Sequence, residues 1–101
     1  MIARLWRGQA SRENADAYAR HFSHTVTASL QTMAGHRGSW LLRRDADGQT
    51  EFLAITLWES RQAIEAFTGP DIDKAIVEPE GRAALSAFDD FARHYEVAFT
   101  S

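Results

Sequence analysis

The sequence predicts an α+β fold, in which an antiparallel sheet carries helices on one of its faces. Three observations predict it. Strand-like alternation occurs at the beginning, middle and end of the chain, one long amphipathic helix follows the first strand, and further helical segments precede the last. The chain has 101 residues, of which 45% are hydrophobic and 25% charged. This composition is typical of one small globular domain, which we expect to cover residues 1–101.

The chain begins with a segment, residues 2–7, whose side chains alternate with the period of two typical of a strand. One face carries Ile2, Arg4 and Trp6, and the other carries Ala3 and Leu5. After it, Ser11 or Asn14 can cap a helix. The apolar positions that follow are spaced three and four apart in a single stripe: Ala15, Tyr18, Ala19, Phe22, Val26, Leu30 and Met33. This spacing predicts one long helix.

A hairpin is the next predicted element. Residues 39–44 and 50–58 alternate as strands, and the sequence Asp-Ala-Asp-Gly at 45–48 between them is rich in residues that tolerate positive φ. The return strand has one aliphatic face, made of Leu53, Ile55 and Leu57, and a reverse face made of Phe52, Ala54, Thr56 and Trp58. Neither face is polar.

The last third of the chain is predicted to be helical before a final strand. Ser60 can cap a short helix that Gly69 and Pro70 end. Residues 71–77 and 79–90 are expected to be helical, and residues 91–99 alternate as a strand. The element order is that of a ferredoxin-like four-stranded antiparallel sheet with its helices on one face.

The apolar groups on both faces of this sheet predict self-association. We expect the helices to cover one face and the face with Trp6, Phe52 and Trp58 to stay open, which would expose several hundred Å² of apolar surface. The side on which Trp40 lies is left undecided by the alternation. An identical sheet from a second copy is the simplest cover. The prediction is therefore a homodimer, a dimeric α+β barrel with a cavity between the two sheets.

Composition excludes several other classes of protein. There is no cysteine, so neither a disulfide nor a thiolate metal site is available, and the net charge of −3 does not suggest a nucleic-acid-binding surface. The charge-free apolar run at residues 52–58 is far shorter than the roughly 20 residues that span a bilayer. We expect a cytoplasmic protein without membrane or nucleic-acid partners. Motifs for nucleotide binding, serine hydrolysis and zinc proteolysis are missing.

Two stretches resemble a known family. Gly-His-Arg-Gly at residues 35–38 and Thr-Leu-Trp-Glu-Ser-Arg-Gln-Ala-Ile at residues 56–64 resemble the GF-x-G and T-x-W-x-S-x-x-A-F stretches of the antibiotic-biosynthesis-monooxygenase-like dimeric α+β barrels. The resemblance covers the whole chain in element order. It implies the fold more strongly than any activity, because branches of this superfamily perform different chemistry.

Two branches of that superfamily have known chemistry, and this sequence departs from both. The cofactor-independent, quinone-forming monooxygenases have an asparagine at the position of Ala54. The haem-degrading branch has an iron-binding histidine at the position of Val77, and an asparagine in the first strand that this chain lacks. The resemblance therefore implies no bound cofactor and no specific haem ligation.

The candidate binding residues follow from the face expected to line the barrel. Trp6, Phe52 and Trp58 would line an apolar cavity suited to a planar aromatic molecule, or would simply fill the dimer core. Arg4 lies on the same face, where a buried guanidinium favours an anionic partner such as a phenolate. Its alternative partner is Glu96, also expected on this face, in an internal ion pair.

His94 is the candidate general base. It is expected beside Glu96, and a histidine with a carboxylate neighbour can remove a phenolic proton; the alternative is a structural histidine. His21 and His24 could bind a metal, but no nearby carboxylate completes a site and none is expected. The predicted function is a cofactor-independent monooxygenase of a small electron-rich aromatic compound. The alternative is a non-catalytic, small-molecule-binding barrel.

Overall fold

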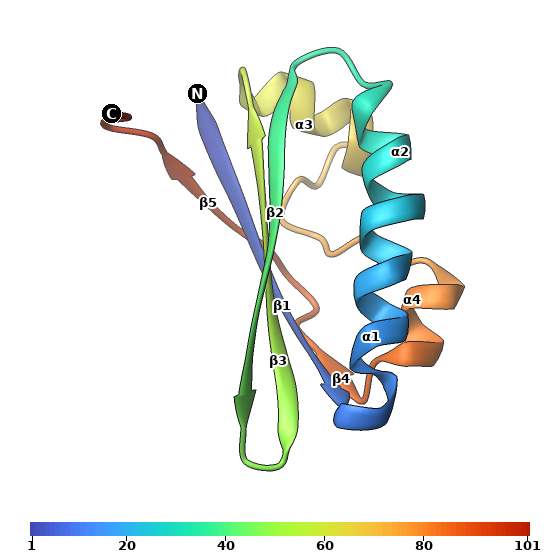
Figure 1. Cartoon of the computed structure of the whole chain (residues 1–101). Helices are drawn as coiled ribbons and strands as arrows, with labels where there is room; N and C mark the ends of the chain where they lie inside the picture. Colours follow the sequence, from blue (N-terminus) through green and yellow to red (C-terminus); the bar gives the residue numbers. More distant parts are fainter.

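The computed structural model describes all residues from Met1 to Ser101. Its elements are β1 (Ile2–Ser11), α1 (Arg12–His21), the π-helix η1 (Phe22–Val26), α2 (Thr27–Gln31), β2 (His36–Ala46), β3 (Gln49–Trp58), α3 (Arg61–Thr68), α4 (Pro79–Ala84), β4 (Ala87–Phe88) and β5 (Arg93–Glu96). The strands form one antiparallel sheet in the order β2-β3-β1-β4, with β5 also paired to β1. Figure 1 shows the helices on one side of it. The predicted ferredoxin-like α+β fold is confirmed.

The helix predicted after the first strand is one continuous helical rod made of α1, η1 and α2 (Figure 1). Ser11 both ends β1 and caps α1, since its Oγ accepts a hydrogen bond from the Asn14 backbone N–H at 3.2 Å. The wider π turn begins at Phe22, whose carbonyl also accepts a bond from the Thr27 hydroxyl at 2.9 Å. Such π turns occur frequently at functional sites.

The predicted hairpin is present and longer than the sequence suggested. Strands β2 and β3 pair from His36 to Trp58, and the turn places Asp47 and Gly48 at φ of 52° and 76°. Both residues suit that conformation, because aspartate tolerates and glycine freely adopts positive φ.

The short helix α3 is capped by Ser60 as predicted: its Oγ accepts a bond from the Ala63 N–H at 3.1 Å.

The predictions for residues 71–90 are partly wrong. Residues 71–77 form no helix, and the segment is bonded to the last part of the chain, with Ala75 N–H donating to the Asp90 carbonyl at 2.9 Å. The helix expected over 79–90 ends at Ala84. Beyond it, the Ser86 N–H donates to the Gln9 carbonyl at 2.8 Å and β4 pairs with β1. Main-chain pairing with an open sheet edge replaces a weak local helical preference here.

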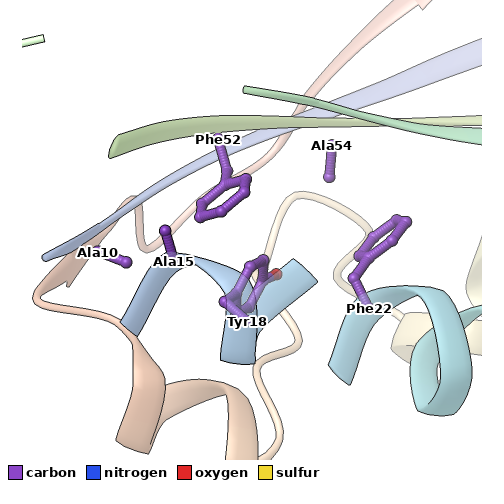
Figure 2. Close-up of a cluster of buried hydrophobic side chains, with 6 residues drawn as sticks. All are labelled: Ala10, Ala15, Tyr18, Phe22, Phe52 and Ala54. Atoms are coloured by element: carbon purple, nitrogen blue, oxygen red, sulfur yellow. The ribbon is translucent and has the colours of Figure 1, made fainter. Parts of the chain in front are cut away.

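The predicted assignment of the two sheet faces is also wrong. The helices cover the face that carries Ile2, Phe52, Ala54 and Trp58, and these side chains form the core of the chain itself. Figure 2 shows Phe52 extending from the sheet toward Tyr18 of α1, and their ring centroids are 5.0 Å apart. Alternation separates a strand into two faces but does not say which face a helix will cover, and here both are apolar.

The face without helices carries the aliphatic set instead. Leu53, Ile55 and Leu57 are half-buried on β3, and the register sets Trp40 opposite Ile55 and Leu42 opposite Leu53. Trp40 is 50% exposed, so it belongs to this uncovered face.

None of the helices has the length and apolar character needed to cross a membrane.

Candidate functional site

A pocket lies between the covered face of the sheet and the helices. The space that water molecules can occupy in it is about 70 Å³, enough for several of them. Its lining combines apolar and aromatic groups with few polar ones: Arg4, Trp6, Tyr18, His21, Phe22, Val26, Ser29, Leu30, Ala54, Thr56, Phe67, Ile76, Val77, Glu78 and Gly81. Such composition is typical of sites for small apolar molecules with a polar group.

Arg4 brings the only cationic side chain that is both buried and in the pocket wall. It is 5% exposed, and its Nη2 donates to the Lys74 carbonyl at 2.9 Å while Nη1 donates to the Ile72 carbonyl. Burial lowers the pKa of Arg4 to about 10, although the nearby Asp73 charge acts in the opposite direction. The guanidinium thus fastens the segment after α3 to β1 and stays charged at neutral pH.

His94 lies behind Arg4 and does not line the pocket. Its Nδ1 is 3.1 Å from Asp73 Oδ1, and its Nε2 is 3.0 Å from Arg4 Nη1. Because Arg4 can only donate, Nε2 is the acceptor and the ring proton lies on Nδ1. Burial and the Arg4 charge lower the pKa of His94, while Asp73 opposes the shift. Both nitrogens are engaged, so neither is aimed at a ligand.

The other predicted site residues are dispersed. Trp6 lines the pocket, and its Nε1 donates to the Asp89 carbonyl at 2.8 Å. Phe52 and Trp58 are fully buried in the core and are not part of the pocket wall. Glu96 is exposed near the end of β5, opposite Ile2, and forms no ion pair with Arg4. The expectation that these groups meet in a cavity between two sheets is therefore wrong.

Two pocket residues were not predicted as site residues: Tyr18 was assigned only to the helix stripe, and His21 was considered only as a metal ligand. Tyr18 is 4% exposed, and burial raises the pKa of its hydroxyl. His21 is also 4% exposed, and its Nδ1 is 3.2 Å from Glu80 Oε2 on α4. The available signal was their spacing of three, which sets both on the helix stripe next to Phe22. His24 is exposed, so the two histidines do not face one site.

The geometry brings together a cation from the sheet, a buried phenol and an imidazole from the helix, and a largely apolar wall. A small aromatic molecule can stack in such a wall, while Arg4 favours an anionic oxygen on it. The arrangement offers binding and proton transfer.

Solved structures of similar fold come from proteins of different chemistry. A haem degrader, MhuD from Mycobacterium tuberculosis with two haems bound, is 20% identical, with a TM-score of 0.69 over 100% of this chain and 99% of that one. SnoaB, a cofactor-independent oxygenase from Streptomyces nogalater, is 21% identical, with a TM-score of 0.67 over 98% and 94%. At such identities the likeness concerns the fold alone. No curated protein matches the sequence significantly.

The sequence match to a family is more extensive. The family model described as antibiotic biosynthesis monooxygenase matches residues 1–79, which include both stretches on which the resemblance was based. Together with the ferredoxin-like sheet and its pocket, this match shows that the chain belongs to the antibiotic biosynthesis monooxygenase family.

Proposed function

We propose that this protein is a cofactor-independent monooxygenase whose substrate is a small, electron-rich, hydroxylated aromatic compound. The observation that carries the proposal is the pocket itself, an apolar and aromatic wall interrupted by the buried cation of Arg4. A deprotonated polyphenol or polyketide-like molecule has the matching chemistry, with a flat apolar body and a localised negative charge.

The reaction needs no redox group from the protein if the ligand itself is the reductant. In an anthrone-like substrate, dioxygen converts the ring methylene to a carbonyl: one oxygen atom stays on the carbon, and the other leaves as water with the two hydrogens. The electrons lost by the carbon reduce dioxygen completely. The protein has to bind the substrate, stabilise its anion and accept a proton.

Arg4 is suited to stabilise that anion. Its guanidinium has five N–H donors, and the contacts with Ile72, Lys74 and His94 leave others free. We propose that His94, predicted above as the base, acts through Arg4 as a positioning residue, because its Nε2 accepts from the guanidinium.

Haem is not part of this proposal. Val77, the position at which the haem-degrading branch is expected to have its histidine, lines the pocket with a side chain that has no lone pair. We derive no step through haem.

The test is an oxygen-uptake screen with hydroxylated anthrones, quinols and flavonoids, without added flavin or metal. Any active compound is retested with Val77→Phe, which fills the pocket, and with Ala17→Phe as a control on the exposed side of α1. We expect uptake to be lost only in Val77→Phe. Uptake at full rate in Val77→Phe would remove the chemistry from this pocket.

A non-catalytic binding protein is the second candidate. The alanine at position 54 favours it, because the resemblance to the quinone-forming monooxygenases would have an asparagine there. This candidate gains if the aromatic compounds bind saturably but support no oxygen uptake.

We also propose that the protein is a homodimer. The uncovered sheet face carries Trp40 at 50%, Leu42 at 47% and Tyr95 at 52% exposure, and a second copy of that face is the simplest complement. Sedimentation is expected to give twice the mass of the chain. Trp40→Glu should give the monomer, and Trp40→Phe should not. A wild-type monomer at micromolar concentration would contradict the proposal.

A further inference from the structure

We propose that His21, held by Glu80, is the catalytic base that takes the phenolic proton of the ligand in the pocket. This inference rests on the proposed function, since it names the proton acceptor of the same site. It replaces His94 in that role and gives a task to a histidine that the sequence analysis had considered only for a metal.

The orientation of the His21 ring leaves one nitrogen available. The carboxylate of Glu80 can only accept, so Nδ1, 3.2 Å from Oε2, donates its proton and Nε2 keeps a lone pair. No protein group bonds to Nε2. Every side-chain nitrogen or oxygen that is fully buried in the structure has a hydrogen-bond partner, so an atom without such a partner is not fully buried. Nε2 is therefore reached by solvent, and because His21 is 4% exposed and lines the pocket, the pocket provides that access.

Gly81 keeps this edge of the ring uncovered. It is buried in the pocket wall, and a Cβ at this position would lie 3.3 Å from His21 Nε2 and 3.5 Å from Tyr18 Cε1. Its φ does not lie in the region that demands glycine. Glycine inside a helix costs about 1 kcal/mol relative to alanine, so the helix itself does not favour it. The close approach to His21 explains it.

The proton transfer is balanced in charge and atoms. The O–H bond of the phenol breaks, an N–H bond forms at Nε2, and no electrons leave the ligand. The products are a phenolate and an imidazolium. The carboxylate of Glu80 stabilises the imidazolium through Nδ1, and Arg4 in the same pocket wall favours the phenolate.

A nitrophenol is a suitable probe, because its phenol and phenolate forms absorb at different wavelengths. It is titrated into the full-length protein at a pH below its own pKa. We expect the bound probe to be ionised, and calorimetry in two buffers of different ionisation enthalpy to show no proton released to the buffer, since His21 keeps it.

Three variants separate His21 from its surroundings. His21→Gln should bind the probe as the neutral phenol, and in any compound that supports oxygen uptake it should lower the rate by about 10²-fold or more. Glu80→Gln should lower the ionised fraction with His21 still present, an effect that a merely structural role would not produce. Gly81→Ala should keep the fold and lower the ionised fraction by covering Nε2.

His24→Gln is the matched control, since His24 is exposed on η1 and outside the pocket wall. It should behave as the wild type. Unchanged ionisation in His21→Gln, with circular dichroism showing a folded protein, would overturn the assignment of His21 and leave the pocket intact. A wild type that binds none of a panel of nitrophenols and polyphenols would instead remove the proposed function.

Discussion

Two histidine–carboxylate pairs in this molecule have nearly the same geometry and different surroundings. His94 Nδ1 is 3.1 Å from Asp73, His21 Nδ1 is 3.2 Å from Glu80, and the two imidazoles are 2% and 3% exposed. The difference lies at the second ring nitrogen. Arg4 occupies Nε2 of His94, whereas Nε2 of His21 has no protein partner. The two pairs therefore differ in the partner of the second nitrogen and not in the carboxylate, and only His21 keeps a ring nitrogen free for a ligand.

We call His94–Asp73 the closed pair, because Arg4 occupies its second ring nitrogen, and His21–Glu80 the open pair. Removing Arg4 from the closed pair should have the largest effect on stability. Arg4→Met removes the donor to the carbonyls of Ile72 and Lys74 and to His94, which leaves three partly buried acceptors without partners. We expect a loss of about 3 kcal/mol in the free energy of unfolding, measured by urea denaturation. Glu80→Gln on the open pair should cost less than about 1 kcal/mol, since the Glu80 side chain is 71% exposed. Equal losses would contradict the distinction.

Acidification should weaken the closed pair next. The folded pKa of His94 lies below its ordinary value of 6.5, so as the pH falls below 6.5 the unfolded chain binds a proton that the folded chain does not. The free energy of unfolding therefore decreases from pH 6.5 down to the lowered pKa. His36, whose pKa burial also lowers, adds to it with the same sign. Denaturation curves at several pH values should show a shallower decline in His94→Gln. An identical decline would contradict the role of His94.

A smaller effect should appear in the NMR spectra of the two rings. Long-range proton–nitrogen correlations at pH 7.5 should show His94 as the tautomer with its proton on Nδ1. His21 should show the same tautomer if Glu80 accepts from it. Asp73→Asn should perturb the nitrogen shifts of His94 alone, and Glu80→Gln those of His21 alone. Cross-effects would show that the two pairs are coupled.

The smallest expected effect is the response to haem. Because Val77 has no ligating atom, haem titration should produce no saturable Soret shift of one haem per chain. A saturable shift that persists in His94→Ala and disappears in His21→Ala would contradict this prediction, and would also confirm that Nε2 of His21 is the accessible one.

Much of the fold was predictable because its signals are local. Ser11 and Ser60 cap helices through bonds to the N–H three residues later, and Asp47 and Gly48 turn the hairpin with positive φ. The helix stripe through Tyr18 has a spacing set by helix geometry alone. These interactions involve residues within a few positions of each other, so a single sequence contains them completely.

The segment after α3 was not predictable in the same way. Residues 71–77 were expected to be helical, but Arg4, distant in sequence, holds the carbonyls of Ile72 and Lys74. The strand β4 likewise replaced the end of a predicted helix because the edge of β1 offered main-chain partners. Such bonds outweigh a weak local preference.

The sequence by itself determined the order of the elements as far as α3, the caps of α1 and α3, the hairpin turn, and the existence of two apolar sheet faces. The tertiary structure decided which face the helices cover, and hence that Trp58 is core and Trp40 surface. It also joined His21 to Glu80 across 59 positions and Arg4 to His94 across 90. The physical reason is that alternation and propensity depend on neighbours in the chain, whereas the burial of a face and the occupation of a ring nitrogen depend on groups brought together only by folding.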